Sequence, residues 1–408
     1  MERMIEKGYS SLSRINLELT EEQTILLKTV DEMCQKIRPI EDKCYIERRF
    51  NDSLKDILAS YHMLGLPISR EYGDGQGADT VTYCLALERI GEEGTGVRTF
   101  LSVHTSLCEL TIEQWGTEEQ KELLLPKGTR GEHVFAFGLT EPNAGSDPAS
   151  LATQFEEKNG KYVLNGQKMW ISNGSIANYV IIFAYPKGRR EGMSAFIVSS
   201  DTSGFVSRRI ENKMGIPTSD TAAIYLDNVE VPKDMMLGPQ GKGLSVAYSA
   251  LMNGRLSVAA GCVGVMRDCL KEMIRYASLR IQHGKQIGKH QLVQRHIAKV
   301  HSELEASSLL LLKAAYLKQK YMKERSNTQL RDEADKMIAT AKYYAANASF
   351  DAANRAVQVF GANGYSLENR PARHLLDTRV TMIYEGTNEI LEQKIAVSLL
   401  GKEFEAYK

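Results

Sequence analysis

The residues best suited to chemistry in this sequence form the turn Tyr384-Glu385-Gly386-Thr387. One carboxylate stands here after an apolar approach that includes Met382, and before a Gly-Thr pair that opens a helical pattern. Gly386 suits close approach of the backbone to a ligand, and Thr387 suits the N-cap of a helix. Partial desolvation raises the pKa of such a carboxylate and makes it a stronger base. Glu385 is therefore a candidate general base, although this stretch alone is equally consistent with a surface Glu in a turn.

Three further stretches carry polar or aromatic groups in positions that suit ligand binding. The loop 137–147 gathers Thr, Asn, Gly and Ser around a Pro turn, so its N–H groups and hydroxyls suit a polar heterocycle or a phosphate. Trp170 and Ser172 place an aromatic plane and a hydroxyl at the end of a strand pattern. Arg280 ends a helical pattern before a Gly turn, which suits an anion or the negative end of the helix dipole. The structural alternatives are a polar loop, a core Trp and a helix-capping Arg.

The elements that must position these residues change character twice along the chain. Helical spacing runs from about 20 to 125, beginning at a capping box of Thr20 and Gln23. Short β segments follow to about 237, with a hairpin predicted at Asn165-Gly166. Long helical stretches cover about 244–283, 292–324, 330–361 and 387–400. The pattern predicts an α+β, mainly α fold: an N-terminal helical domain (1–132), a middle β-barrel or sandwich (133–240) and a C-terminal four-helix bundle (241–408).

Composition excludes several classes of function. A chain of 408 residues exceeds what one core usually serves, and 51 basic against 51 acidic residues give no support to nucleic-acid binding. The six cysteines lack CxxC spacing and the histidines lack a metal-ligand pattern, so reduced thiols and no metal site are expected. No apolar run approaches the roughly 20 residues of a spanning helix, and residues 2–7 alternate in charge. We expect a cytoplasmic protein without membrane insertion, whose mature form begins at this N-terminus.

Taken together and in order, the motifs resemble one family, the flavin-dependent acyl-CoA dehydrogenases. The resemblance covers nearly the whole chain and implies the same three-domain architecture. It also implies one FAD per subunit, an acyl-CoA substrate, an electron-transferring flavoprotein as partner and a homotetramer. The motifs that carry it are Gly65-Leu66-Pro67, Glu71-Tyr72-Gly73, Leu139-Thr140-Glu141-Pro142, Ala144-Gly145-Ser146-Asp147, Lys168-Met169-Trp170-Ile171-Ser172-Asn173-Gly174, Ser219-Asp220-Thr221-Ala222, Gln358-Val359-Phe360-Gly361-Ala362-Asn363-Gly364-Tyr365 and Tyr384-Glu385-Gly386-Thr387-Asn388-Glu389-Ile390.

The resemblance implies a role for each matching position. Glu385 would remove the α-proton of the thioester while a β-hydride passes to the flavin. The acyl-CoA path would be lined by Ser146, Arg255 and Gly386. The flavin ring would be lined by Phe137, Leu139, Thr140, Trp170 and Ser172, with Ser146 beside the cofactor and with Thr387 and Glu389 closing over it. The FAD of a neighbouring subunit would be contacted by Arg280, Gln282, His283, Gln291, Gln358, Gly361 and Ala362.

Some positions depart from the family pattern. Gly254 occupies the place where some members carry the base on a helix, so Glu385 is the base implied here. His283 replaces a usual Phe and Ala362 a frequent Gly, changes that still allow FAD binding. Met252 replaces an Asp that several members use to hold the pantetheine arm, which leaves the holding of that arm unassigned.

Substrate choice stays open between two alternatives. Arg98 lies in a segment similar to the one that binds a distal carboxylate in glutaryl-CoA dehydrogenases, where a guanidinium would select a dicarboxylic acyl chain. Alternatively Arg98 is an exposed residue paired with Glu92 or Glu93, and the substrate is a plain short- or medium-chain thioester. An acyl-CoA oxidase or flavin monooxygenase on the same fold, or a flavin-free interaction protein, are further alternatives. A helical repeat scaffold is excluded by the β stretch and the lack of a repeat period.

Overall fold

The computed structural model describes residues 18–406 and begins with a helical domain. The predicted capping box is confirmed, because the Thr20 hydroxyl accepts from the Gln23 N–H and the Gln23 side chain accepts from the Thr20 N–H. The charge alternation noted at residues 2–7 lies outside the described residues. The helices are α2 (Glu21–Glu47), α3 (Asp52–Ser60), α4 (Thr80–Gly91), α5 (Thr95–Ser102), a π-helical segment (Val103–Glu109), α6 (Leu110–Trp115) and α7 (Glu118–Thr129).

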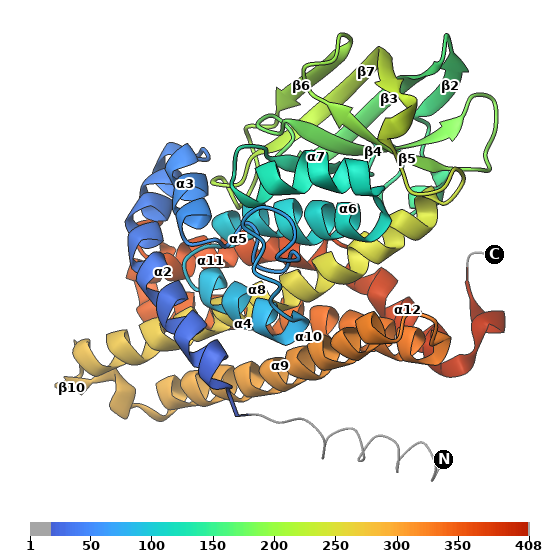
Figure 1. Ribbon diagram of the computed structural model, residues 1–408. Coiled ribbons are helices and arrows are strands. Elements are labelled where there is room, and N and C mark those ends of the chain that lie inside the picture. Colours follow the sequence, from blue (N-terminus) through green and yellow to red (C-terminus); the bar gives the residue numbers. More distant parts are fainter. Residues whose placement is uncertain (1–17, 407–408) are drawn as a thin grey trace.

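The middle of the chain forms a mainly antiparallel sheet that lies above the helices in Figure 1. The strands run in the order β6-β7-β3-β2-β4-β5-β8, and β1 joins by pairing in parallel with β4. Separate apolar clusters lie on the two faces of the sheet, and the one that holds Phe137 and Leu139 also contains Val246 from the next helix. The strands are β1 (Phe135–Gly138), β2 (Gln154–Lys158), β3 (Lys161–Ser172), β4 (Tyr179–Pro186), β5 (Ser194–Ser199), β6 (Phe205–Arg209), β7 (Thr221–Pro232) and β8 (Met236–Leu237).

The predicted hairpin at Asn165-Gly166 is wrong. β3 passes through both residues without turning, and its pairing with β7 shifts register between Leu164 and Gly166. A Cβ on Gly166 would lie 2.4 Å from the Thr153 hydroxyl oxygen, so this glycine serves close packing at a bulge. The turn that joins β2 to β3 lies earlier, at Asn159-Gly160, where both residues have positive φ. Asn159-Gly160 and Asn165-Gly166 are both candidate hairpin turns in the sequence, and only the backbone conformation shows which of them forms the turn.

The C-terminal domain is a bundle of long helices that crosses the N-terminal helices (Figure 1). α8 crosses α4 in backbone contact, because a Cβ on Gly264 would lie 2.0 Å from the Glu88 carbonyl oxygen. The two cores thereby merge into one apolar cluster shared by both helical domains. The elements are α8 (Gly243–Leu279), β9 (Ile281–Gln282), β10 (Lys285–Gln286), α9 (Gln291–Lys323), α10 (Thr328–Phe360), α11 (Arg370–Thr378) and α12 (Asn388–Leu400).

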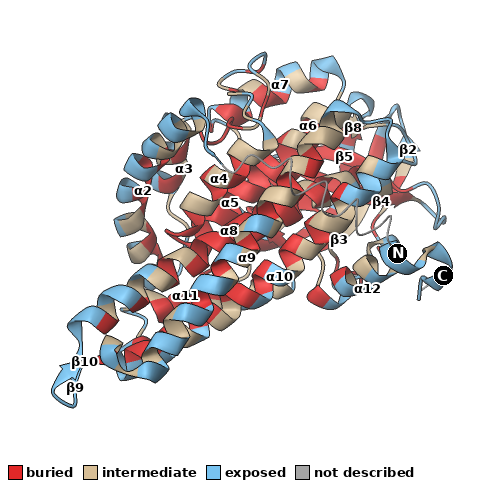
Figure 2. Ribbon diagram, turned by 90° about the horizontal axis from the view of Figure 1, so that it is seen from below, coloured by how far each residue is buried: buried red, intermediate tan, exposed pale blue. Residues whose placement is uncertain are grey.

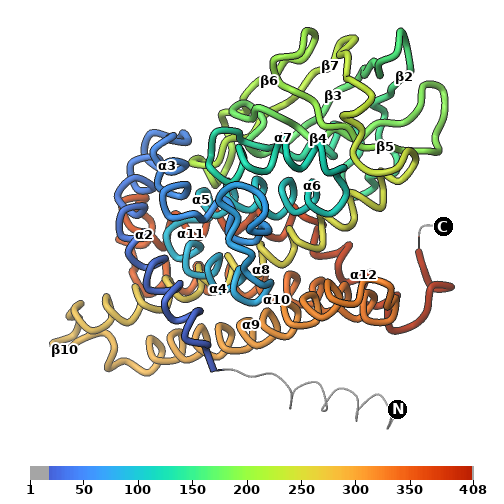
Figure 3. The backbone as a smooth tube through the Cα atoms, in the orientation of Figure 1, coloured from blue at the N-terminus to red at the C-terminus, as the bar shows by residue number. Residues whose placement is uncertain are grey.

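Burial is greatest where α4, α5 and α8 meet, and the β9–β10 hairpin protrudes from the end of the bundle (Figure 2). The chain path in Figure 3 brings α11, late in the sequence, back against the N-terminal helices. Arg370 secures that return by donating to the carbonyl oxygens of Glu92 and Glu93 and to the Asp268 carboxylate. All six cysteines are buried and unbonded, as expected. No helix within residues 18–406 has the length and apolar character needed to cross a membrane.

Candidate active site at the Glu385 turn

The Glu385 turn connects a 3-10 segment, Arg379–Met382, to α12. Thr387 is the N-cap of α12, since its hydroxyl accepts from the Ile390 N–H at 3.3 Å. Glu385 and Gly386 both adopt left-handed backbone angles, with φ of 58° and 97°. This conformation is unfavourable for a Glu, and strained residues of this kind occur at functional sites. The fold therefore holds Glu385 in a backbone geometry that its own preference does not supply.

One oxygen of the Glu385 carboxylate, Oε2, is enclosed by protein and lacks a hydrogen-bond partner. Part of the residue is exposed, but Oε2 has no exposed surface and no partner. The carboxylate lies against Gly254 on α8, where an added Cβ would be 2.5 Å from Oε2. Burial raises the pKa of Glu385 to about 7, and the positive charges of Arg255, Lys342 and Arg98 oppose part of that rise. A carboxyl of this pKa exchanges a proton readily near neutral pH.

Two buried cations hold the backbone of the turn rather than its carboxylate. Arg255 Nε donates to the Glu385 carbonyl oxygen at 2.8 Å, and Lys342 Nζ donates to the Gly386 carbonyl oxygen at 2.8 Å. Lys342 is fully buried and also donates to Asn388 Oδ1 at 3.4 Å. The turn is thus fixed through its carbonyl groups, and neither of these two hydrogen bonds uses the Glu385 carboxylate.

Sequence reasoning did not identify Lys342. Its signal was a single Lys on an otherwise apolar, alanine-rich helix face, between Ala339 and Ala345. A lysine in such a position must find acceptors or lose its charge, and here the acceptors come from the Glu385 turn.

Arg98 lies next to this turn and is 2% exposed. Its Nη2 donates to the Tyr384 hydroxyl, and its Nε is buried without a partner. The side chain packs against Gly261, where a Cβ would be 2.6 Å from Nε. No carboxylate of residues 18–406 pairs with this guanidinium.

The alternative that Arg98 is exposed and paired with Glu92 or Glu93 is wrong. Glu92 pairs with Lys271, and Glu93 pairs with basic residues of α2 and α4. Both carboxylates are therefore committed to cations other than Arg98. Arg98 is left as a buried cation that faces the region beside Glu385.

A second group of the predicted residues lies on the β domain. Trp170 has a φ of 62° and is 57% exposed, which is unusual for an indole at the end of a buried strand. The Met169 N–H donates to the Thr140 carbonyl oxygen at 2.9 Å, so Trp170 and Thr140 are neighbours. Beneath them Lys168 and Glu141 form a fully enclosed ion pair at 2.8 Å. The predicted ring-contact residues lie on β1 or the residues just after it and on the last part of β3, two segments that contact each other; they are Phe137, Leu139, Thr140, Trp170 and Ser172.

A third group lies elsewhere, at the end of the bundle that carries the β9–β10 hairpin. Figure 1 shows this hairpin far from the β domain. Arg280 is exposed there and its guanidinium pairs with no described carboxylate. Asn363 Nδ2 donates to the Tyr276 hydroxyl at 2.9 Å, which ties the end of α10 to α8. Within a single chain, the residues at the hairpin end do not meet the residues around Trp170. The hairpin-end residues are Arg280, Gln282, His283, Gln291, Gln358, Gly361 and Ala362.

The remaining predicted residues are distributed as follows. Ser146 is exposed on the loop after β1, and Glu389 is exposed in the first turn of α12. A hydrogen bond from its own backbone N–H at the start of the helix, and a second one from the Thr387 hydroxyl, hold the pKa of Glu389 below its usual value. Among residues 18–406, His, Cys, Asp and Glu side chains form no group of three or more suited to a metal ion.

The sequence matches three domain descriptions in the expected order. They are the N-terminal domain of acyl-CoA dehydrogenase at residues 20–132, the middle domain at 136–229 and the C-terminal domain at 241–400.

Relatives with known names match over nearly their full length. An acyl-CoA dehydrogenase of Bacillus subtilis is 37% identical over 94% of this chain and 100% of its own. A glutaryl-CoA dehydrogenase of Desulfococcus multivorans is 34% identical over 95% and 98%.

Solved structures agree in fold. Butyryl-CoA dehydrogenase of Megasphaera elsdenii superposes with a TM-score of 0.89 at 35% identity, covering 95% of this chain and all of its own. A chain in a structure of the electron transferring flavoprotein of Acidaminococcus fermentans gives 0.90 at 34% identity, with the same coverage.

Proposed function

This chain belongs to the acyl-CoA dehydrogenase family, a family of FAD-dependent oxidoreductases, and we propose that it converts an acyl-CoA thioester to the trans-2-enoyl-CoA with Glu385 as the base. The observation that carries the proposal is the Glu385 carboxylate, which lies against Gly254 and whose Oε2 is buried without a hydrogen-bond partner. Residue 254 cannot supply a base of its own, because it is a glycine and the Glu385 carboxylate fills the space beside it.

The residues on the β domain fit a flavin. Trp170 offers an exposed aromatic plane, and Thr140 and Ser172 offer hydroxyls beside it. An exposed indole gains by stacking on a planar heterocycle, which removes apolar area from water. FAD, when bound, supplies the ring that accepts the β-hydride and passes the two electrons on to an electron-transferring flavoprotein.

The chain's own residues then account for the proton. Near its pKa of about 7 a substantial fraction of Glu385 is ionised at neutral pH and can take the α-proton of the thioester. The backbone N–H of Glu385 donates to no described residue, so it is available to the thioester oxygen as negative charge gathers there. An oriented donor of this kind typically contributes about 3–4 kcal/mol to lowering a barrier. Arg255 and Lys342 keep both the carboxylate and this N–H in place.

A second candidate concerns the substrate: a dicarboxylic thioester such as glutaryl-CoA. The specific observation is Arg98, which is buried beside the turn, has an unpartnered Nε and pairs with no described carboxylate. A buried guanidinium is costly unless an anion meets it, and a distal carboxylate on the acyl chain would do so with bidentate geometry. A short-chain monocarboxylic substrate leaves that cation unmatched.

We further propose a homotetramer in which each subunit completes its neighbour's cofactor site. The hairpin end of the bundle exposes Ile281 at 58% and Tyr365 at 89%, an apolar surface typical of an interface. Arg280 lies in the same region with an uncommitted guanidinium, which suits the pyrophosphate of FAD held by another subunit.

The decisive experiment is anaerobic flavin bleaching of the purified FAD-loaded protein. Butyryl-, octanoyl-, isovaleryl- and glutaryl-CoA are each added to the wild type and to Glu385→Gln, whose FAD content is measured first. We expect bleaching by at least one thioester in the wild type and none in the variant. A variant that retains FAD and bleaches at the wild-type rate would refute Glu385 as the base. Bleaching by glutaryl-CoA alone would establish the dicarboxylic substrate.

A further inference from the structure

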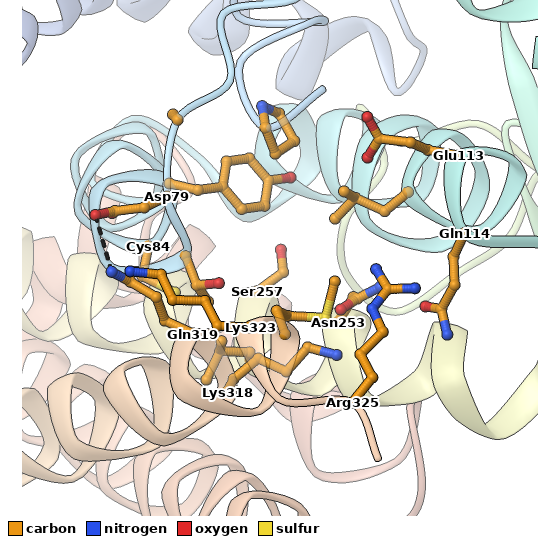
Figure 4. A pocket seen from close by; sticks show the side chains of 17 residues that line it. Asp79, Cys84, Glu113, Gln114, Asn253, Ser257, Lys318, Gln319, Lys323 and Arg325 are labelled. Carbon is orange, nitrogen blue, oxygen red and sulfur yellow. Dashed lines mark hydrogen bonds between the residues drawn. The ribbon is translucent and has the colours of Figure 1, made fainter. Parts of the chain in front are cut away.

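A cavity lies between α4, α6, α8 and α9, on a different side of α8 from the Glu385 carboxylate. Its volume is about 260 Å³, and none of the residues assigned above to the base, the flavin or the acyl-CoA path lines it. Gly254 faces Glu385, whereas the neighbouring positions Asn253 and Ser257 face this cavity. Figure 4 shows Ser257 and Lys318 between Asp79 and Gln319 on one side and Glu113 and Arg325 on the other. We call it the Lys318 pocket.

Two polar side chains in the Lys318 pocket are buried and lack a hydrogen-bond partner. Lys318 is 3% exposed, and its ammonium makes no hydrogen bond or ion pair with any of residues 18–406; it lies 5.6 Å from the centroid of the Tyr321 ring. Ser257 is 1% exposed and its Oγ is unpartnered. An ammonium and a hydroxyl without acceptors are unfavourable in the interior of a protein. Because both side chains line the same cavity, one from α8 and one from α9, the missing acceptor is expected to come from outside the chain.

The acidic residues of the pocket are already engaged. Asp79 caps α4 by accepting from the Thr82 N–H at 2.8 Å, and it also accepts from Gln319 at 3.2 Å. Glu113 accepts from the Ser69 N–H at 2.8 Å. Neither carboxylate pairs with Lys318, so the ammonium remains open to an added anion.

The surroundings define the kind of anion. Two more basic residues, Lys323 and Arg325, are exposed at the rim and form no ion pair with a described carboxylate, so they favour the approach of negative charge. The inner walls are apolar, and a cavity of this size lies just below the roughly 300–1,000 Å³ of drug-sized ligand sites. A multiply charged anion would be repelled by the nearby Asp79 and Glu113 and has too few donors here. The apolar wall residues are Pro67, Leu110, Leu256 and Met322.

We propose that the Lys318 pocket binds a small organic monoanion, a carboxylate on a short apolar body, with its oxygens on Lys318 Nζ and Ser257 Oγ. This site is independent of the proposed dehydrogenation, because it requires neither the flavin nor Glu385. The ammonium and the hydroxyl would bind the carboxylate of the ligand, and the apolar wall residues would contact its hydrocarbon part.

The test is isothermal titration of the FAD-loaded protein with hexanoate, with neutral hexanamide and with inorganic phosphate, at fixed pH and ionic strength. We expect hexanoate to bind, and hexanamide and phosphate to bind at least tenfold more weakly. Equal binding of hexanoate and hexanamide, preferential binding of phosphate, or no binding of hexanoate would each overturn the proposal. These comparisons use the wild type and need no variant to fold.

Variants then locate the bound hexanoate. Lys318→Met keeps the volume and removes the charge, and we expect it to weaken hexanoate at least tenfold. Lys313→Met, on the same helix but outside the pocket, should leave binding unchanged. Arg98→Met is the second control, because Arg98 is another buried cation that pairs with no carboxylate of residues 18–406. Loss of hexanoate binding in Arg98→Met but not in Lys318→Met would place the anion in the acyl site and refute the Lys318 pocket.

Discussion

The replacement Gly254→Ala tests whether the position of the Glu385 carboxylate matters for catalysis. The added methyl group would stand 2.5 Å from Oε2 and 2.6 Å from Cδ, so the carboxylate must withdraw by about 1 Å to restore ordinary contact. The atom that moves is the end of a flexible side chain, so the fold can absorb the change. A misplacement of about 1 Å in a reacting group can lower a rate by about 100-fold.

Stability should change in the opposite direction to activity. Ala is favoured over Gly inside a helix by about 1 kcal/mol, and position 254 lies well within α8. We therefore expect Gly254→Ala to melt at or above the wild-type temperature, to retain FAD, and to reduce its flavin about 100-fold more slowly. The assay is stopped-flow flavin bleaching under anaerobic conditions with the best thioester substrate, beside thermal melting of the FAD-loaded protein.

Gly261→Ala is the matched control, because it makes the same change on the same helix against a different side chain. Its methyl group would lie 2.6 Å from Arg98 Nε rather than against Glu385. It should spare the rate with butyryl-CoA and affect a dicarboxylic thioester instead. If Gly254→Ala folds, binds FAD and bleaches at the wild-type rate, the carboxylate does not act from the position seen here, and the assignment of Glu385 as base fails.

Three other outcomes follow from the same geometry. The proton acceptor is ionised Glu385, whose pKa is raised to about 7, so kcat/KM should climb about tenfold per pH unit below that value and level off above it. Lys342→Met removes a positive charge that lowers the pKa of Glu385, so the inflection of this pH profile should move to higher pH. An inflection that does not move would contradict the coupling between Lys342 and Glu385. Arg98→Met should lower kcat/KM for glutaryl-CoA roughly 10–150-fold, the value of a charge-assisted hydrogen bond, and spare butyryl-CoA; equal losses for both would argue against distal-carboxylate binding. Arg280→Glu should weaken FAD retention about tenfold or more, measured as flavin per protomer after gel filtration, while the Trp170 surface stays intact; full retention would remove Arg280 from the cofactor site.

Sequence reasoning succeeded where structure is local. The capping box at Thr20 and the N-cap at Thr387 were recognised because the residues involved lie three positions apart, so their types determine the contact. The long helices were placed closely because their apolar period persists for many turns. The domain order was visible in the change of period, and Glu385 stood out as a carboxylate beside apolar residues.

It failed where two local signals competed or where the local signal did not identify the partner. Asn165-Gly166 and Asn159-Gly160 are the same dipeptide, and only packing against Thr153 shows that the first is a bulge and the second a turn. Lys342 had no motif, because its acceptors lie more than 40 residues away in sequence, on Gly386 and Asn388.

Tertiary structure alone decided the electrostatic state of the cations and of the base. Arg98 had two carboxylates close by in sequence, yet Glu92 pairs with a lysine of α8 and Glu93 with arginines of α2 and α4, which leaves Arg98 buried with Tyr384. The composition of the chain determined which residue types were present and which helices they would form. Whether a charged side chain is exposed, paired or buried without a partner depends on which segments, distant in sequence, pack against it. Those contacts form only when the whole core packs.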